Sequence, residues 1–387
     1  MGRVTLLTYK DLVDHLVDWM GANPSAEAHR DARRAILSAM EELTAEANWS
    51  YLYDRYRVTT SAPYNTGTIA YDHTGGTNER MVTLTDGIWP DWADQGTLLI
   101  GTNVYEISSR ISDSVITLTS NTNPGEDLSA GTTYTLYRDT FPLPSNFTSM
   151  GEMVAIGQQV VLTYEHPNKW LARQRTFLGT GTPRTYCVRG NPNYMGILGL
   201  SLYPPPDNVY SLDMIYKRSP RELKIDDYST GTVTCSTASL SITGSGTSWS
   251  SKHVGSIIRL SSSTTTLPTG AAGSNPAEIE RVITAVSSAT SCTVDELPSS
   301  NLTGVKYVIS DPVDIEAGSM KTALLRGCEY QIAVSRRMQE REIAERAYKA
   351  SVISARESDS RNFRPDVVGW NVRWPMRMAN MPYQSGV

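Results

Sequence analysis

The chain has 387 residues, which is enough for two or three domains with buried cores. Charged residues make up 19% of it and the formal net charge is −5, which excludes a broad basic surface that neutralises nucleic-acid phosphates. The opening residues have no apolar stretch of secretory length, and no run approaches the roughly 18 apolar residues that cross a bilayer. With four single cysteines and no CxxC pair, we expect a protein made in a reducing cytoplasm, without a membrane partner.

Residues 1–65 carry two helical patterns. Thr8 and Asp11 have the spacing of a capping box, and the apolar residues after them predict a helix that Gly21 closes. A second predicted helix follows Asn23-Pro24. Its stripe consists of small residues: Ala28, Ala32, Ala35, Ile36, Ala39, Leu43 and Ala47. Small residues let helix backbones approach closely, so this helix should pack tightly against another one.

Two later stretches, 66–138 and 230–310, consist of short apolar alternations broken by turn residues, which predicts strands. The two stretches also align with each other. Matching positions are Thr66 and Thr230, Trp89 and Trp249, Gly96 and Gly255, Ile100 and Arg259, and Tyr134 and Tyr307. We interpret them as two small all-β barrel or sandwich modules inserted into a host domain.

The segment between the modules, 139–229, is predicted to be a β-rich part of the host domain. Strand-like runs at 184–189 and 197–203 flank a Gly/Asn turn and predict a hairpin. A further strand is expected at 210–218, and residues 167–178 have the pattern of a short helix.

Residues 311–358 form the longest stretch with a helical pattern. Apolar residues recur in steps of four at Met320, Leu324, Cys328 and Ile332, and Ala344, Ala347 and Tyr348 continue the stripe. The pattern leaves open whether this is one helix or two. Such a stripe needs a partner, and the other strongly helical sequence lies at the N-terminus. We therefore predict an α+β fold in which both ends of the chain form a helical bundle beside a small β host region.

Residues 359–387 contain three prolines among tryptophans and arginines, which predicts an extended C-terminal arm. Aromatic and arginine side chains are enriched at binding hot spots. The docking candidates are Phe363, Arg364, Trp370, Arg373, Trp374, Arg377 and Tyr383. The alternative is a tail that folds back over its own subunit.

The sequence suggests no convincing active site. The five histidines share no metal-ligand spacing, Gly179–Pro183 lacks the lysine of a phosphate loop, and Cys187 has no neighbouring base. We therefore expect no catalytic residues, no metal and no cofactor. The tryptophans Trp89, Trp92 and Trp249 can stack on sugars in principle, but a place in the module cores is the favoured interpretation.

Several host segments carry a resemblance to a known family. They are the helix pair 8–49, FPLPSNF at 141–147, GTPRTY at 181–186, LSLYPPPD at 200–207, YKRSP at 216–220 and the helical stretch after Asp311. Together these segments resemble the head-to-tail adaptor, or connector, proteins of tailed bacteriophages. The chain departs from that family in its length, because adaptors are often much shorter, and in its two β-modules.

The resemblance implies a structural protein of the virion neck without enzymatic activity. Such adaptors form a homo-oligomeric ring, commonly of twelve subunits, beneath the portal protein and above the tail or neck proteins. Their C-terminal extension docks on the portal, which by position is 359–387 here. Genomic DNA would pass through the ring without sequence recognition, and a net acidic protein would let it slide.

A ring needs two complementary faces on each subunit. Residues 1–57 contain seven basic and nine acidic residues (net −2), whereas residues 319–356 contain eight basic and four acidic residues (net +4). Opposite charges would guide association between neighbours. The contact candidates are Arg336, Arg337, Arg341, Arg346, Glu41, Glu42 and Glu46. A solvated, ion-paired helix face is the plainer interpretation of these charges.

Two other classes of function compete with the adaptor hypothesis. The β-modules suit a carbohydrate-binding or host-adhesion protein of the tail, although adhesins are normally trimers with long fibrous repeats. A tail-associated hydrolase would need a carboxylate or nucleophile constellation that the sequence does not display.

Overall fold

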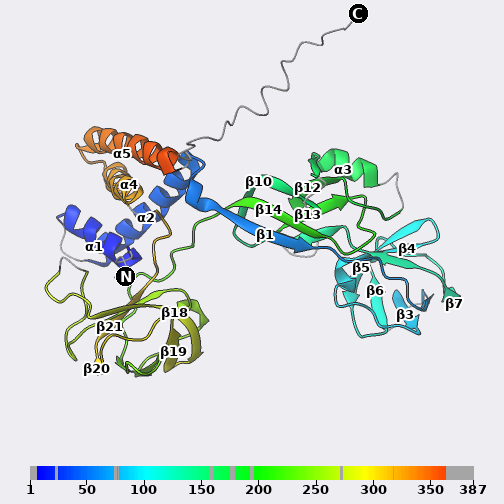
Figure 1. Ribbon diagram of the computed structural model, residues 1–387, viewed down its shortest axis with the longest axis horizontal. Helices are drawn as coiled ribbons and strands as arrows, with labels where there is room; N and C mark the ends of the chain where they lie inside the picture. Colours follow the sequence, from blue (N-terminus) through cyan, green and yellow to red (C-terminus); the bar gives the residue numbers. More distant parts are fainter. Residues whose placement is uncertain are drawn as a thin grey trace, which may run out of the picture. The chain divides into compact units, whose positions relative to one another are not determined.

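The computed structural model describes residues 7–21, 25–73, 76, 78–156, 161–174, 179–191, 196–270, 273–316 and 318–362 (Figure 1). The chain divides into two compact units. Unit 1 comprises Met1–Tyr51 and Pro220–Val387, and unit 2 comprises Leu52–Ser219. The architecture is α+β, as the sequence predicts.

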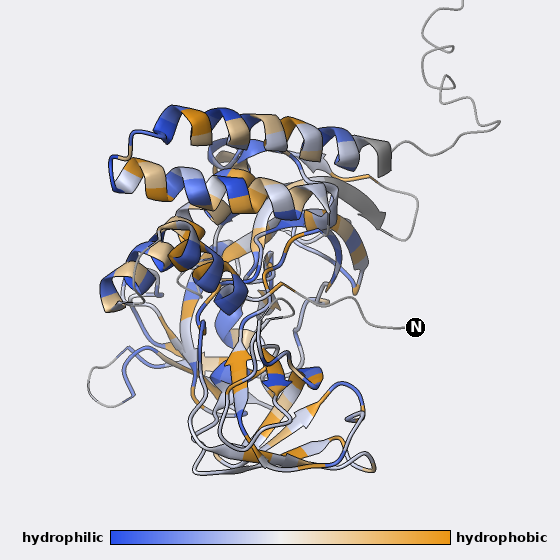
Figure 2. Cartoon of the chain, turned by 90° about the vertical axis from the view of Figure 1, so that its left-hand side faces the viewer, coloured by the Kyte–Doolittle hydropathy of each residue, from blue (hydrophilic) through white to orange (hydrophobic). Residues whose placement is uncertain are grey.

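The helices of unit 1 form a bundle that contains both ends of the described chain. They are α1 (Tyr9–Trp19), α2 (Ala26–Glu46), α4 (Ser319–Ser335) and α5 (Arg341–Asn362), with a 3₁₀ turn η1 (Ser50–Leu52) after α2. Helix α2 packs on α1 and on α4, and α4 packs on α5. Hydrophobic and hydrophilic residues alternate along these helices, as amphipathic packing requires (Figure 2). The prediction that the N- and C-terminal helices meet is confirmed.

Small residues allow the helices to approach closely. The predicted stripe of α2 is buried from Ala28 to Leu43, and Gly327 on α4 lies beside α5. A Cβ atom at Gly327 would sit 3.0 Å from the ring of the buried Tyr348, so glycine is what permits this approach. Figure 1 shows α4 and α5 side by side, joined by a short turn in which Arg337 has a left-handed φ of 50°. The C-terminal helical stretch is therefore two helices.

The arm begins later than the sequence suggests, because α5 continues through Asn362. Residues 359–362 are therefore helical. The carboxylate of Asp359 accepts hydrogen bonds from the backbone N–H and the hydroxyl of Ser50, beyond the end of α2. This contact fixes the last turn of α5 to the rest of the bundle.

Each β-module is a curled, seven-stranded antiparallel sheet, and both have the same strand order. Module 1, in unit 2, has the order β7-β2-β3-β6-β5-β4-β8. Its strands are β2 (Thr68–Tyr71), β3 (Met81–Thr85), β4 (Thr97–Ile100), β5 (Asn103–Arg110), β6 (Val115–Leu118), β7 (Leu128–Thr132) and β8 (Thr135–Tyr137), with a 3₁₀ turn η2 (Ala93–Gln95).

Module 2, in unit 1, repeats this arrangement as β20-β15-β16-β19-β18-β17-β21. Its strands are β15 (Thr232–Cys235), β16 (Ser241–Ser245), β17 (Ile257–Leu260), β18 (Ile279–Ser288), β19 (Ser291–Val294), β20 (Leu302–Val305) and β21 (Tyr307–Ser310), with a 3₁₀ turn η3 (Ser251–His253). The chain therefore contains a structural duplication.

The two modules share details that strand order alone does not require. The hydroxyl of Tyr134 donates to the carbonyl of Thr66 over 2.7 Å, and that of Tyr307 donates to Thr230 over 2.6 Å. Beside these tyrosines, Trp89 and Trp249 are buried in the module cores. The core interpretation of these two tryptophans is thus confirmed, while Trp92 packs half-buried against the core of module 1.

The repeat is shifted by one residue from the match that the sequence suggests along β4 and β17. Leu98 pairs with Leu136 and Ile258 pairs with Ile309, so Leu98 corresponds to Ile258. Arg259 therefore takes the place of Leu99 instead of Ile100. Because alternate residues of a strand point to opposite faces, this shift moves Arg259 to the outer face of module 2.

The rest of unit 2 consists of two small sheets and one helix. The first sheet has the order β1-β14-β10 and the second β11-β12-β13-β9. The elements are β1 (Tyr53–Thr59), β9 (Thr140–Pro142), β10 (Phe147–Ile156), β11 (Thr163–Tyr164), α3 (Pro167–Gln174), β12 (Thr185–Gly190), β13 (Leu198–Tyr203) and β14 (Ser211–Arg218). The predicted hairpin is β12–β13. Strands β1 and β14 pair from Tyr53 opposite Lys217 to Thr59 opposite Ser211.

Candidate functional site at the junction of the bundle and module 2

A densely connected polar cluster of unit 1 lies where the start of α1 meets module 2. Thr8 and Asp11 form the predicted capping box: the Thr8 hydroxyl accepts from the N–H of Asp11 over 3.3 Å, and the Asp11 carboxylate accepts from the N–H of Thr8 over 3.0 Å. This arrangement satisfies exposed amides of the first turn. It also fixes the direction in which the Asp11 carboxylate points.

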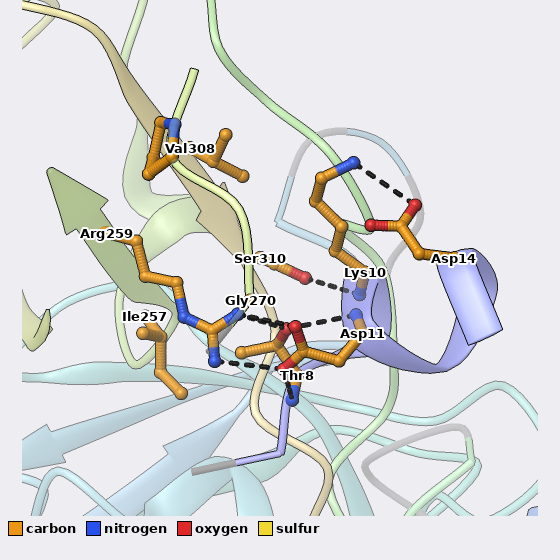
Figure 3. A pocket seen from close by; sticks show the side chains of 10 residues that line it. Thr8, Lys10, Asp11, Asp14, Ile257, Arg259, Gly270, Val308 and Ser310 are labelled. Atoms are coloured by element: carbon orange, nitrogen blue, oxygen red, sulfur yellow. Dashed lines mark hydrogen bonds and ion pairs between the residues drawn. The ribbon is translucent and has the colours of Figure 1, made fainter. Parts of the chain in front are cut away.

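Arg259 of β17 completes this cluster from the side of the module (Figure 3). Its two terminal nitrogens donate to the two carboxylate oxygens of Asp11 over 2.7 and 2.9 Å, and its Nε donates to Glu280 of β18 over 2.9 Å. The side chain of Arg259 is only 7% exposed. A planar guanidinium suits this two-pronged contact. Arg259 therefore joins α1 to two strands of module 2.

The pKa of Asp11 responds to this arrangement. Burial alone would raise the pKa of this carboxyl group, but the hydrogen bonds and charge of Arg259, together with the bonds from Thr8, lower it below its usual value. Asp11 is thus held ionised, as a partner of an arginine must be.

A second buried carboxylate, Asp311, holds the chain where it passes from module 2 towards α4. It is 1% exposed. It accepts hydrogen bonds from the Ser256 hydroxyl over 2.7 Å, from Arg221 over 3.1 Å, and from the backbone N–H groups of Lys224 and Ile225 over 2.7 and 2.8 Å. Its own carbonyl accepts from the N–H of Tyr9 over 2.8 Å. Asp311 therefore binds the start of α1, module 2 and the segment before module 2 together.

Ion pairs surround the two buried carboxylates. Lys10 contacts Asp227 over 2.9 Å and Asp14 over 3.4 Å, and Arg33 of α2 donates to Asp226 over 2.6 Å. These pairs are partly exposed, so each adds at most about 1 kcal/mol. The adjacent aspartates 226 and 227 thus bind two different helices of the bundle.

The hollow at this junction is too small for a substrate. It is lined by Thr8, Lys10, Asp11, Asp14, Ile257, Arg259, Pro268, Gly270, Val308 and Ser310, and has room for about one water molecule. Both oxygens of the Asp11 carboxylate, which lines it, already accept hydrogen bonds from Arg259. The arrangement is suited to holding module 2 rigidly on the bundle, and we name it the junction cluster (Thr8, Asp11, Arg221, Ser256, Arg259, Glu280, Asp311).

An acid titration will test the junction cluster. Because the pKa of Asp11 is lower in the folded chain than in the unfolded chain, its stabilisation is present above the unfolded value and is lost as pH falls through the folded value. We expect Asp11→Asn, which keeps the cap but loses the charge, to have a lower melting temperature than wild type at neutral pH. This difference in melting temperature should become smaller below about pH 4. Thermal unfolding of both proteins from pH 7 to 3 measures the difference. Asp18→Asn, an exposed change on the same helix, should melt at almost the wild-type temperature. A difference between Asp11→Asn and wild type that stays constant with pH would contradict the proposed ion pair of Asp11 with Arg259.

The structure also places the predicted subunit-contact residues. Several already bind within the chain: Arg336 pairs with Asp31 over 3.0 Å, Glu42 accepts from Gln331 over 2.6 Å, and Glu46 pairs with Arg356 over 3.0 Å. Arg346 lies 3.8 Å from Glu342 on the outer side of α5.

The remaining candidates, Arg337, Arg341 and Glu41, are exposed. The seven charges thus divide into a set that stabilises the bundle and a set that faces solvent. The arm candidates Phe363, Arg364, Trp370, Arg373, Trp374, Arg377 and Tyr383 lie outside the described residues.

The cysteines have the surroundings of buried apolar residues. Cys187, Cys235, Cys292 and Cys328 are free thiols, and burial raises the pKa of each, to about 11 for Cys187 and about 12 for Cys292. A thiol with a raised pKa is a poor nucleophile. Within the described part of the chain, no three His, Cys, Asp or Glu side chains gather closely enough to hold a metal ion.

Sequence reasoning identified the cap of α1 but missed its partner. Arg259 lies 248 positions away, so no local spacing relates it to Asp11. A signal did exist in the internal repeat, because an arginine stands in a strand of module 2 where module 1 has only aliphatic residues.

No known protein family matches the sequence, and no curated protein matches it either. Within the described residues, no helix is both long enough and apolar enough to span a membrane.

Proposed function

We propose that this protein is a structural subunit of a phage neck: a head-to-tail adaptor that forms a ring beneath the portal protein. The observation that carries the proposal is the outer face of α5. It exposes Ile343 by 70% and Ile353 by 58%, interspersed with the basic residues Arg346 and Lys349. Large apolar side chains on one exposed helix face are typical of a surface that binds another protein.

A different face of the same bundle has a different character. On α2, Leu37 is 44% exposed and Glu41, one helical turn further on, is also exposed. On the α5 face, Arg346 and Lys349 pair with Glu342 and Glu345 of the same helix, whereas the α2 face is apolar and acidic. Two unlike surfaces on each subunit are what heterologous contacts require. Closure of such contacts gives a ring.

The other parts of the proposal come from the sequence and its resemblance to adaptors. The arm, with its tryptophans and arginines, would dock on the portal. Tail or neck proteins would bind below, and DNA would pass as cargo through a channel whose walls belong to a chain of net charge −5. The junction cluster supports this mechanical role, because it fixes module 2 to the bundle that would build the ring.

The proposal is tested by assembly of the full chain, alone and with purified portal protein, followed by native mass spectrometry and negative-stain microscopy. We expect closed rings for wild type. A stable trimer that binds glycans would favour the adhesin hypothesis instead.

Ile343→Asp combined with Ile353→Asp should abolish these rings without lowering the melting temperature by more than about 2 °C, since both side chains are exposed. Leu240→Asp in module 2, at a residue 41% exposed, is the matched control and should assemble normally. Rings that form equally well in the double variant would show that the α5 face is not an interface.

A further inference from the structure

The sheet β1-β14-β10 of unit 2 has two outer strands, β1 and β10 (Figure 1). Each of them pairs with β14 in an antiparallel manner, so β1 and β10 run in the same direction. Among the described residues of unit 2, neither strand has a strand on its other side. The outer strands of such a sheet expose backbone groups that can pair with another chain.

The ladder shows which residues of β1 face outwards. The N–H of Thr60 donates to the carbonyl of Tyr210 over 2.9 Å, just beyond the paired residues Thr59 and Ser211. Hydrogen-bonded pairs alternate in an antiparallel ladder. Arg55 and Arg57 therefore direct their N–H and C=O groups away from β14.

The edge of β1 lacks two of the usual protections against pairing. Its seven residues include no proline, and its pairing with β14 runs without a bulge. The outward N–H of Arg55 donates to the carboxylate of Asp54 over 2.7 Å, a local bond that pairing with another chain would replace. Charged side chains often guard such an edge, but Arg55 and Arg57 bind Asp213 of β14 over 2.6–3.1 Å and are thereby drawn along the sheet. Both arginines remain well exposed, at 67% and 59%.

We propose that the β1 edge of one copy pairs with the β10 edge of a second copy, so that a continuous sheet runs from subunit to subunit. This inference rests on the proposed ring. Copies related by rotation place strands of the same direction side by side, so the new pair would be parallel. Strand β10 has irregularities in its register after Phe147, Met150 and Met153, so the new hydrogen bonds would form in the stretches between them. Both edges are used, and each is used once per subunit, as heterologous closure requires.

Charge selects this pairing over one between two β1 strands. Strand β1 carries Asp54, Arg55 and Arg57, a net charge of +1 (two basic and one acidic), whereas β10 carries a single charge, that of Glu152, a net charge of −1. An antiparallel pair of β1 strands centred on Tyr56 would place Arg55 opposite Arg57 of the other copy twice. Like charges directly opposite each other destabilise a sheet. Pairing with β10 avoids this repulsion.

The first experiment compares Arg55→Pro with Arg55→Ala in the full chain. Both variants lose the ion pair with Asp213, but proline also removes the outward N–H group, which in the single subunit donates to Asp54. An edge strand tolerates proline at a position whose N–H points outwards. We expect Arg55→Ala to form rings and Arg55→Pro to remain a folded monomer with an unchanged circular dichroism spectrum. Hydrogen exchange of residues 53–59 should slow when wild type assembles. Rings of Arg55→Pro, or exchange that does not change on assembly, would overturn the inference.

The second experiment uses introduced cysteines and does not depend on the proline variant. Under oxidation, Arg55→Cys combined with Ser149→Cys, an exposed position on β10, should give disulfide-linked ladders of subunits, and either single variant should not. A linked dimer of Arg55→Cys alone would overturn the inference in favour of β1–β1 pairing. Wild type that never assembles, even with portal protein, would overturn the proposed function and this inference together. Wild-type rings without ladders in the double-cysteine variant would overturn this inference alone.

Discussion

Replacing Arg259 by leucine, the residue at the equivalent place in module 1, should destabilise unit 1 by about 3–5 kcal/mol. The substitution removes a nearly buried guanidinium that the carboxylates of Asp11 and Glu280 share. Loss of one partner from a buried ion pair is costly, whereas a complete pair contributes little net stability. Differential scanning calorimetry and hydrogen exchange across α1 and β17 measure the loss.

The neighbouring strand supplies a matched control. Arg281 on β18 is half-buried and donates only to backbone carbonyls, those of Glu280, Glu296 and Leu297, so Arg281→Leu removes no ion pair and should cost about 1 kcal/mol. Adding Asp11→Asn and Glu280→Gln to Arg259→Leu should recover part of the stability, because the two carboxylates that faced Arg259 are then neutral. Equal losses for Arg259→Leu and Arg281→Leu would show that the junction cluster does not hold module 2 on the bundle.

Removing the arm should abolish portal binding while leaving a folded ring subunit. The cut belongs after Asn362 and not before Asp359, because Asp359 binds Ser50 and fixes the end of α5. A chain ending at residue 362 should melt at the wild-type temperature and fail to co-sediment with portal rings. Normal co-sedimentation would remove the arm from the proposal.

Within the arm, the two tryptophans should contribute most to docking. Trp370→Ala combined with Trp374→Ala is expected to weaken portal affinity by at least about 30-fold, since buried aromatic anchors often contribute about 2 kcal/mol or more. Arg361→Ala with Arg364→Ala is the comparison and should have a smaller effect. Titration calorimetry with the portal protein measures the affinity of each double variant. A larger loss of affinity for the arginine variant would show that the arginines contribute more to docking than the tryptophans.

Much of the fold could be predicted because it depends on short-range patterns. The alanine stripe of α2, the four-residue steps of α4 and the Thr8–Asp11 cap each follow from a local period or spacing. The duplicated modules were visible as repeated tryptophan, glycine and tyrosine positions. The strand register was less certain, because neighbouring apolar residues such as Leu98 and Leu99 align equally well with either phase of a strand.

The junction cluster could not be predicted in the same way. Asp311 binds Ser256, Arg221 and two backbone amides that lie far from it in the chain, and no periodic signal relates these groups. The last turn of α5 was missed for a related reason. Its polar sequence lacks an apolar stripe, and the contact between Asp359 and Ser50 comes from tertiary structure.

The register of β1 and β14 also bears on how a chain of this length could arise. The polypeptide enters unit 2 at Leu52 and leaves it at Ser219, and near these two ends Tyr53 and Lys217 face each other on neighbouring strands. Their backbones are therefore about 5 Å apart, so a few residues could bridge the gap if everything between them were deleted. Insertion or deletion of the whole of unit 2 in one genetic event would leave the path of the remaining polypeptide unchanged. Shorter and longer versions of such a protein can thus diverge without any rearrangement of the helices at their ends.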